Sequence, residues 1–201
     1  MTIRTRGARG ILTALATGAA LVSAAVPATA ADGPAFLEPA QLPPHPSSSW
    51  YAGPVTAGQP DPLPICVGAA LPSVSVHRAY WTEFDTSALQ VTVVERDARR
   101  AADFAALLRK DLAGCARHLE SEYPDIAATG RYYGKVDVEE GAHVYGIHTT
   151  ATWGASDIAL FSVGRDGRTV TVVKWSQMGT FRDAPVKDFK TTTRAAVDRL
   201  A

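Results

Sequence analysis

Residues 157–176, DIALFSVGRDGRTVTVVKWS, decide the fold of this chain. Two runs rich in apolar and β-branched residues flank an Asp166-Gly167 pair, which is typical of the two-residue turn that joins antiparallel strands. With that pair at the centre of the turn, Leu160 stands opposite Val173. The pattern therefore predicts a β-hairpin, and the neighbouring segments must supply the rest of a sheet.

Both faces of the predicted hairpin are apolar. One face carries Ile158, Leu160, Val173 and Trp175, and the other carries Phe161, Val163, Val170 and Val172. An antiparallel sheet with one face in water alternates apolar with polar residues instead. One face can pack against helices. The other is either covered, by a proline-rich segment or by a curled sheet, or it lines a ligand cleft.

If the second face lines a cleft, aromatic and hydrogen-bonding residues on neighbouring strands are the candidates to bind a ligand. These candidates are Tyr132, Tyr133, Tyr145, His148, Trp153 and Trp175. Each of them, taken alone, is equally compatible with a packed core or with a sheet surface.

The segment 65–201 reads as one folded domain with the element order ββαββββα. Alternation of apolar residues predicts strands at 77–84, 89–95, 129–139, 143–153, 157–164 and 169–176. Helical spacing predicts one helix from 97 to about 120 and a second from 183 onward. We therefore expect an α+β fold, an antiparallel sheet of about six strands with two helices packed against it.

The first thirty residues have the pattern of a secretory signal peptide. Three arginines precede an uncharged stretch at 11–26, and small residues then lead to a predicted cleavage site between Ala30 and Ala31. An uncleaved membrane anchor is the alternative, but the apolar stretch is short for a span of about 20 residues. The pattern predicts a secreted protein, extracellular or associated with the cell wall.

Residues 31–64 hold nine of the 13 prolines of the chain. Proline lacks the backbone N–H donor, so this segment is expected to supply neither a central strand nor a helix interior. We interpret it as an extended, mostly solvated arm, either a spacer or a ligand for a proline-recognition groove. Trp50 and Tyr51 interrupt the arm and are candidates to dock on the domain.

The chain has two cysteines, Cys66 at the start of the domain and Cys115 on the apolar stripe of the first helix. In a secreted protein, two cysteines most simply form one disulfide. A reactive thiol is the competing interpretation, but a cysteine in an apolar setting is usually inert.

The remaining chemistry is sparse. The 20 basic residues balance 20 acidic ones, which argues against a nucleic-acid binder that works through a general basic field. His143 and His148 lie five residues apart on one predicted strand, so they point to opposite faces and form a poor metal site. No G-x-S-x-G elbow or phosphate-binding glycine loop is present in the sequence, although a remote pair of carboxylates would suit a glycosidase. We expect no catalytic residue, metal or cofactor.

The pattern of 66–201 resembles a known family. The features are a cysteine at the domain start, a helix of the form F-x3-L-x6-C through Phe104, Leu108 and Cys115, and two hairpins whose last strand reads TVTVVKW. This resembles the extracellular sensor domain of the mycobacterial serine/threonine kinase PknH and its stand-alone secreted relatives in actinobacteria. The resemblance implies a non-enzymatic, disulfide-stabilised ligand-sensing domain with a central cleft.

From these observations we expect a secreted, non-catalytic sensor-like domain that binds a small molecule or a cell-envelope component. The expected partners are that ligand and a possible protein partner, with no nucleic acid and no membrane span. Two alternatives stay open. One is a secreted hydrolase with its site in the same cleft, and the other is an interaction or inhibitor module that docks through an exposed apolar hairpin face.

Overall fold

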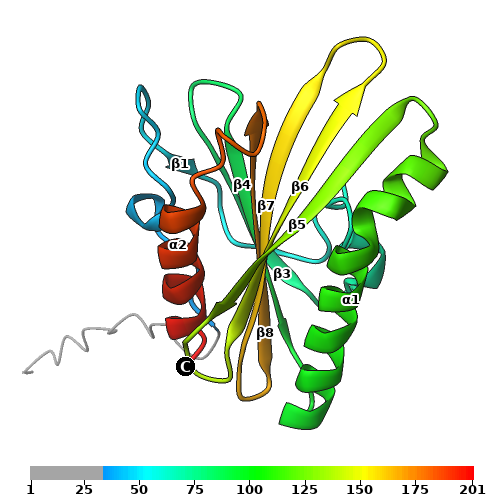
Figure 1. Cartoon of the computed structure of the whole chain (residues 1–201). Coiled ribbons are helices and arrows are strands. Elements are labelled where there is room, and N and C mark those ends of the chain that lie inside the picture. The colour runs from blue at the N-terminus through cyan, green and yellow to red at the C-terminus, as the bar shows by residue number, and fades with distance from the viewer. Residues whose placement is uncertain (1–33) are drawn as a thin grey trace, which may run out of the picture. The chain divides into compact units, whose positions relative to one another are not determined.

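The computed structural model describes residues 34–201 (Figure 1). The predicted signal peptide at 1–30 and its cleavage between Ala30 and Ala31 lie outside the described residues. Among residues 34–201, no helix is both long enough and apolar enough to cross a membrane.

The described chain is an α+β fold built on one antiparallel sheet of eight strands. The strands are β1 (Tyr51–Ala52), β2 (Thr56–Ala57), β3 (Val76–Trp81), β4 (Ser87–Val94), β5 (Ile126–Val136), β6 (Ala142–Ala151), β7 (Ser156–Asp166) and β8 (Thr169–Met178). The helices are α1 (Ala98–Glu122) and α2 (Val186–Asp198). In space the strands follow the order β1-β3-β4-β8-β7-β6-β5, with β2 also paired to β3. The six long strands and both helices agree with the predicted order, and the two additional strands are pairs of residues contributed by the proline-rich segment.

The β7–β8 hairpin forms as predicted, but its register differs by two residues. Leu160 pairs with Trp175 rather than with Val173, because the turn lies between Asp166 and Thr169. Gly167, with φ of 51°, takes the first central position, which a type II′ turn gives to glycine. Because side chains alternate with a period of two, a shift of two residues leaves every side chain on its predicted face.

The two helices cover opposite faces of the sheet, as Figure 1 shows. Leu108 and Leu112 of α1 belong to one core cluster with Phe161 and Val172. On the other face, α2 buries its apolar side against the hairpin, and its residues share a cluster with Leu160, Val173 and Trp175. The expectation that only one hairpin face meets the helices was therefore wrong. The apolar residues of the β7–β8 hairpin are covered on both faces of the sheet. Neither face of the hairpin therefore offers the flat exposed patch that an interaction module would use.

The proline-rich segment packs on the α2 face, which corrects the expectation of a mostly solvated arm. Leu37 is completely buried, its N–H donates to Gln90 Oε1 at 2.8 Å, and its carbonyl accepts from the Tyr80 hydroxyl at 2.8 Å. Trp50 is also buried, in the same cluster as Leu160 and Trp175, so the docking expected of this ring is confirmed. Tyr51, in contrast, is 42% exposed. The prolines still limit the segment to two very short strands at the sheet edge.

Candidate functional site

A cavity of about 260 Å³ lies on the α1 face, at the end of the sheet where β7 begins and β8 ends. It is lined by Ile65, Asp85, Ile147, Thr149, Asp157, Ile158, Ala159, Lys174, Ser176, Gln177 and Met178. No residue of α1 is among them, because this part of the sheet is faced by the loop that carries Ile65 instead.

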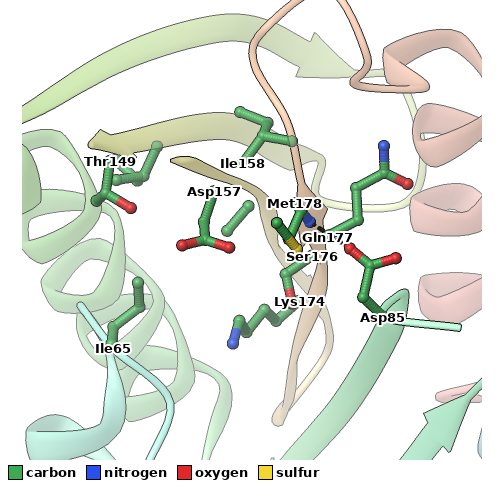
Figure 2. A pocket seen from close by; sticks show the side chains of 11 residues that line it. Ile65, Asp85, Thr149, Asp157, Ile158, Lys174, Ser176, Gln177 and Met178 are labelled. Carbon is green, nitrogen blue, oxygen red and sulfur yellow. Dashed lines mark hydrogen bonds between the residues drawn. The ribbon is translucent and has the colours of Figure 1, made fainter. Parts of the chain in front are cut away.

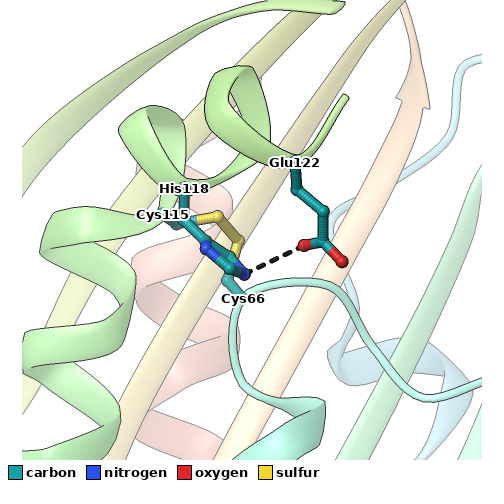
Figure 3. The surroundings of a disulfide bond; sticks show 4 residues. All are labelled: Cys66, Cys115, His118 and Glu122. Carbon is teal, nitrogen blue, oxygen red and sulfur yellow. Dashed lines mark ion pairs between the residues drawn. A yellow bond between two sulfur atoms is a disulfide. The ribbon is translucent and has the colours of Figure 1, made fainter. Parts of the chain in front are cut away.

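The predicted disulfide between Cys66 and Cys115 is present and fixes that loop to α1 (Figure 3). The two Cα atoms are 5.2 Å apart, and an ion pair between His118 and Glu122 lies beside the crosslink. Val67, which follows the first cysteine, is completely buried in the same cluster as α1. The loop is therefore anchored by a covalent bond and by an adjacent buried side chain.

The backbone at Cys66 is bent into a tight γ-turn. Its φ is 70°, and the N–H of Val67 donates to Ile65 O at 2.8 Å across it. A non-glycine residue in this region stores about 1–3 kcal/mol of strain and persists only where its surroundings hold it. The turn presents Ile65, which is 41% exposed, as one wall of the cavity.

Two oppositely charged side chains reach into the cavity without meeting. Figure 2 shows the Asp157 carboxylate from β7 and the Lys174 amino group from β8 extending into the same space, with Ile65 facing them. Within residues 34–201, neither charged group forms a hydrogen bond or an ion pair with another side chain or backbone atom. Burial lowers the pKa of the Lys174 amino group from its usual 10.5, and the Asp157 carboxylate offsets part of this shift.

Two other polar side chains at the cavity, Asp85 and Ser176, are already hydrogen-bonded. Asp85 Oδ2 accepts the backbone N–H of Met178 at 2.8 Å, which fixes the end of β8 against the β3–β4 turn. The Ser176 hydroxyl lies 3.2 Å from the Ser87 hydroxyl on the adjacent strand. The carboxylate and the amine therefore remain as an acceptor and a donor offered to whatever enters the cavity.

The six aromatic and histidine candidates do not gather in one cleft, and none of them lines this cavity. Tyr132 and Tyr145 lie on the α1 face, and Tyr133 and His148 lie on the α2 face against Gly146 and Phe181 respectively. These placements follow from strand alternation and from a bulge between Tyr132 and Gly134. A single cleft lined by all of them is therefore not formed.

The two tryptophan candidates are also apart from each other. Trp153 is 71% exposed, beyond the end of β6, while Trp175 is 3% exposed in the α2-face core. Trp175 borders a second hollow of about 480 Å³ between the proline-rich segment and the β3–β4 turn. Ligand binding by these residues stays a prediction.

His143 and His148 point to opposite faces, as expected from their spacing. His143 accepts from Arg109 at 2.9 Å through Nε2, because a guanidinium can only donate, and its Nδ1 lies 2.8 Å from the Tyr132 hydroxyl. Burial lowers the pKa of His143, and the neighbouring Arg109 charge lowers it further. His148 lies 3.0 Å from the Ser156 hydroxyl. In the described part of the chain, no three His, Cys, Asp or Glu side chains are grouped so as to hold a metal ion.

Sequence reasoning gave no role to Lys174 or Asp157, although both carry a detectable signal. In the alternating strand TVTVVKW, Lys174 follows Val170 and Val172 on the inward face. Asp157 lies on the same face of β7 as Ala159 and Phe161 but is exposed, at the start of the strand. A charged residue at an inward position of an apolar strand indicates either a buried pair or a ligand site.

Comparisons with known proteins supply no family for this chain. No protein-family model, no curated protein and no solved structure matches it.

Proposed function

We propose that this protein is a secreted, non-catalytic binding domain whose ligand enters the cavity between the Ile65 loop and the sheet. The unpaired Lys174 amine and Asp157 carboxylate carry the proposal. Lys174 is half-buried, and holding its charge there without a hydrogen-bond partner costs stability, whereas Asp157 is exposed beside it. A ligand that accepts from the amine recovers part of that cost, and the carboxylate offers it a second polar contact. Active and binding sites are the places where proteins tolerate such groups.

The ligand must offer acceptors to the amine and donors to the carboxylate. Among small organic groups, hydroxyls and amides do both. The apolar wall supplied by Ile65 and Ile147 suits the hydrocarbon part of the same ligand. A non-enzymatic domain that senses a ligand is also what the resemblance to the PknH sensor domain implies.

Hydrolysis is the alternative that the same cavity could serve, because Lys174 with a lowered pKa lies two residues from Ser176 on β8. A serine nucleophile must be within hydrogen-bond reach of its base. The Ser176 hydroxyl instead lies 3.2 Å from Ser87 Oγ. This pairing favours binding over catalysis.

The test is calorimetric titration of the full chain with glucose, xylose, N-acetylglucosamine and glycine. Lys174→Met and Asp157→Asn should each weaken binding of the responding ligand by about ten- to a hundredfold, the usual effect of losing a hydrogen bond to a charged group. Lys187→Met, which removes an exposed lysine from α2, is the matched control and should bind as the wild type does.

Two results would contradict the proposal. If none of the four compounds binds, or if Lys174→Met binds as tightly as Lys187→Met, the cavity is not the ligand site. Ester hydrolysis that is abolished by Ser176→Ala would establish the enzymatic alternative. Thermal melts of each variant check that the fold is intact.

A further inference from the structure

One register row of the sheet leads from an exposed edge directly into the cavity. Strand pairing aligns Tyr51, Trp81, Ser87, Ser176, Ala159 and Ile147 across β1, β3, β4, β8, β7 and β6. All of these side chains point to the face on which the cavity lies. The first three are exposed, Ser176 is half-buried, and the last two are buried. Burial therefore increases along the row, from exposed side chains at the sheet edge to buried ones that line the cavity.

The outer end of this row is an aromatic surface held in place. The rings of Tyr51 and Trp81 stack with centroids 6.4 Å apart and an interplanar angle of 23°. The Tyr51 hydroxyl donates to Glu83 Oε1 at 2.9 Å, which fixes that ring. Gly53 lies beneath the indole, since a Cβ added there would be 3.5 Å from Trp81 Cζ3. Trp81 nevertheless remains 46% exposed, so part of this ring is open to contact by a ligand.

The cavity is too small to hold a ligand that also reaches Trp81. Its 260 Å³ is below the ~300 Å³ at which the usual range of small-molecule pockets begins. Lys174 on β8 and Trp81 on β3 are two strand spacings apart, about 10 Å across the sheet. A ligand that uses both must be elongated, with one end in the cavity and the rest along the row.

We propose that the row is a binding site for a neutral oligosaccharide, with a terminal sugar in the cavity and a further sugar stacked on Trp81; this rests on the proposed function of the cavity. Sugar rings present polarised C–H groups on their faces, which suit the electron-rich face of an indole. Their hydroxyls both donate and accept, which suits the hydrogen-bonding capacity that the paired Ser87 and Ser176 hydroxyls keep between the two ends.

The charges of the site favour a neutral sugar over an acidic one. Two carboxylates, Asp85 and Asp157, line the cavity beside one amine, Lys174. An aliphatic ligand fits less well, because it would leave the amine and the carboxylate without partners as it excludes water.

The experiment compares hexamers with monomers by calorimetric titration of the full chain. The probes are cellohexaose, xylohexaose and chitohexaose, each set against its own monomer. At least one hexamer should bind about two- to tenfold more tightly than its monomer, which is the factor that one aromatic stacking contact supplies. Trp81→Ala should remove this gain and leave the affinity of the monomer unchanged.

Trp153→Ala is the matched control, because Trp153 is also highly exposed but lies away from the row. It should bind the hexamer as the wild type does. Equal affinity for hexamer and monomer, absence of hexamer binding, or equal losses in the two tryptophan variants would overturn the inference. If the monomer still depends on Lys174, only the extended row fails. If Lys174→Met binds every probe as the wild type does, the proposed function fails as well.

Discussion

Gly164→Ala should destabilise the fold strongly although it adds a single methyl group. Gly164 lies near the end of β7 on the face covered by α2. A Cβ built there would be 2.3 Å from Val197 Cγ2 and 3.1 Å from the Ala142 Cβ. Carbon atoms in good contact are about 3.5–4.0 Å apart, so the Val197 methyl must move by more than 1 Å.

Val197 cannot move away cheaply. It is completely buried, and a β-branched side chain in a helix has one strongly preferred rotamer. The strain therefore passes to the backbone of α2, and overpacking of this kind destabilises a protein by about 1–3 kcal/mol. For a domain of this size each kcal/mol lowers Tm by about 2–4 °C.

Gly130→Ala provides the control for this prediction. Gly130 also lies inside a strand, but its added Cβ would be 3.6 Å and 3.7 Å from its nearest neighbours, which are ordinary contacts. Losing a glycine from the unfolded chain should make this variant equal to the wild type or up to about 1 kcal/mol more stable. Urea denaturation of both variants measures the difference. Equal stabilities of the two variants would refute the close approach of α2 to β7.

Three further predictions concern other parts of the fold. Because the pKa of His143 is lowered in the folded state, the unfolded chain binds the proton first, and the free energy of unfolding should fall as the pH decreases from 6.5. His143→Gln should flatten this pH dependence in urea titrations between pH 7 and 5. An unchanged slope would contradict the assignment. Replacing Cys66 and Cys115 by serine should lower stability by about 4 kcal/mol, as expected for a loop of 49 residues; a loss below 1 kcal/mol in denaturant melts would argue against it. Leu37→Ala should lower stability by about 2–5 kcal/mol, because Leu37 is completely buried. Leu63→Ala, in the same segment, should change stability little, because Leu63 is 49% exposed. Similar melts for the two variants would show that the segment is not part of the core.

The sequence predicted the sheet well because alternation of side chains is a property of each strand alone. The assignment of Leu160 and Val173 to one face held although their predicted pairing was off by two residues. The turn was misplaced because an Asp-Gly pair fits the centre of a type I′ turn, whereas a type II′ turn with Gly167 at its first central position needs only one residue with positive φ.

The sheet faces that the helices and the proline-rich segment cover could not be predicted from side-chain alternation. Nothing in the apolar stripes of α1 and α2 states which face of the sheet each one covers. Proline content correctly excluded a central strand from the segment. It does not report the burial of Leu37, which depends on Gln90 and Tyr80 far along the chain.

The candidate site could not be predicted from the sequence for a related reason. The cavity joins Ile65 to Asp157 and Lys174, and only the three-dimensional arrangement brings that loop over those strands. Aromatic residues were predicted as ligand contacts because they are common in ligand sites. In the structure, strand alternation places some of them on the α1 face and others on the α2 face of the sheet, and Trp153 lies in a turn. Cys66 and Cys115 were predicted as a pair because the chain has no other cysteines, and the structure confirms that pair.

On the proposed function, the crosslink at Cys66 links occupancy of the cavity to the redox state of the surroundings. A ligand that rests against Ile65 prefers the oxidised chain, in which the γ-turn holds that side chain in place. Thermodynamic reciprocity then requires that the bound ligand make the disulfide harder to reduce, by the same factor. A reductant should therefore weaken binding of that ligand, and the ligand in excess should shift the reduction potential of the cysteine pair to a more negative value.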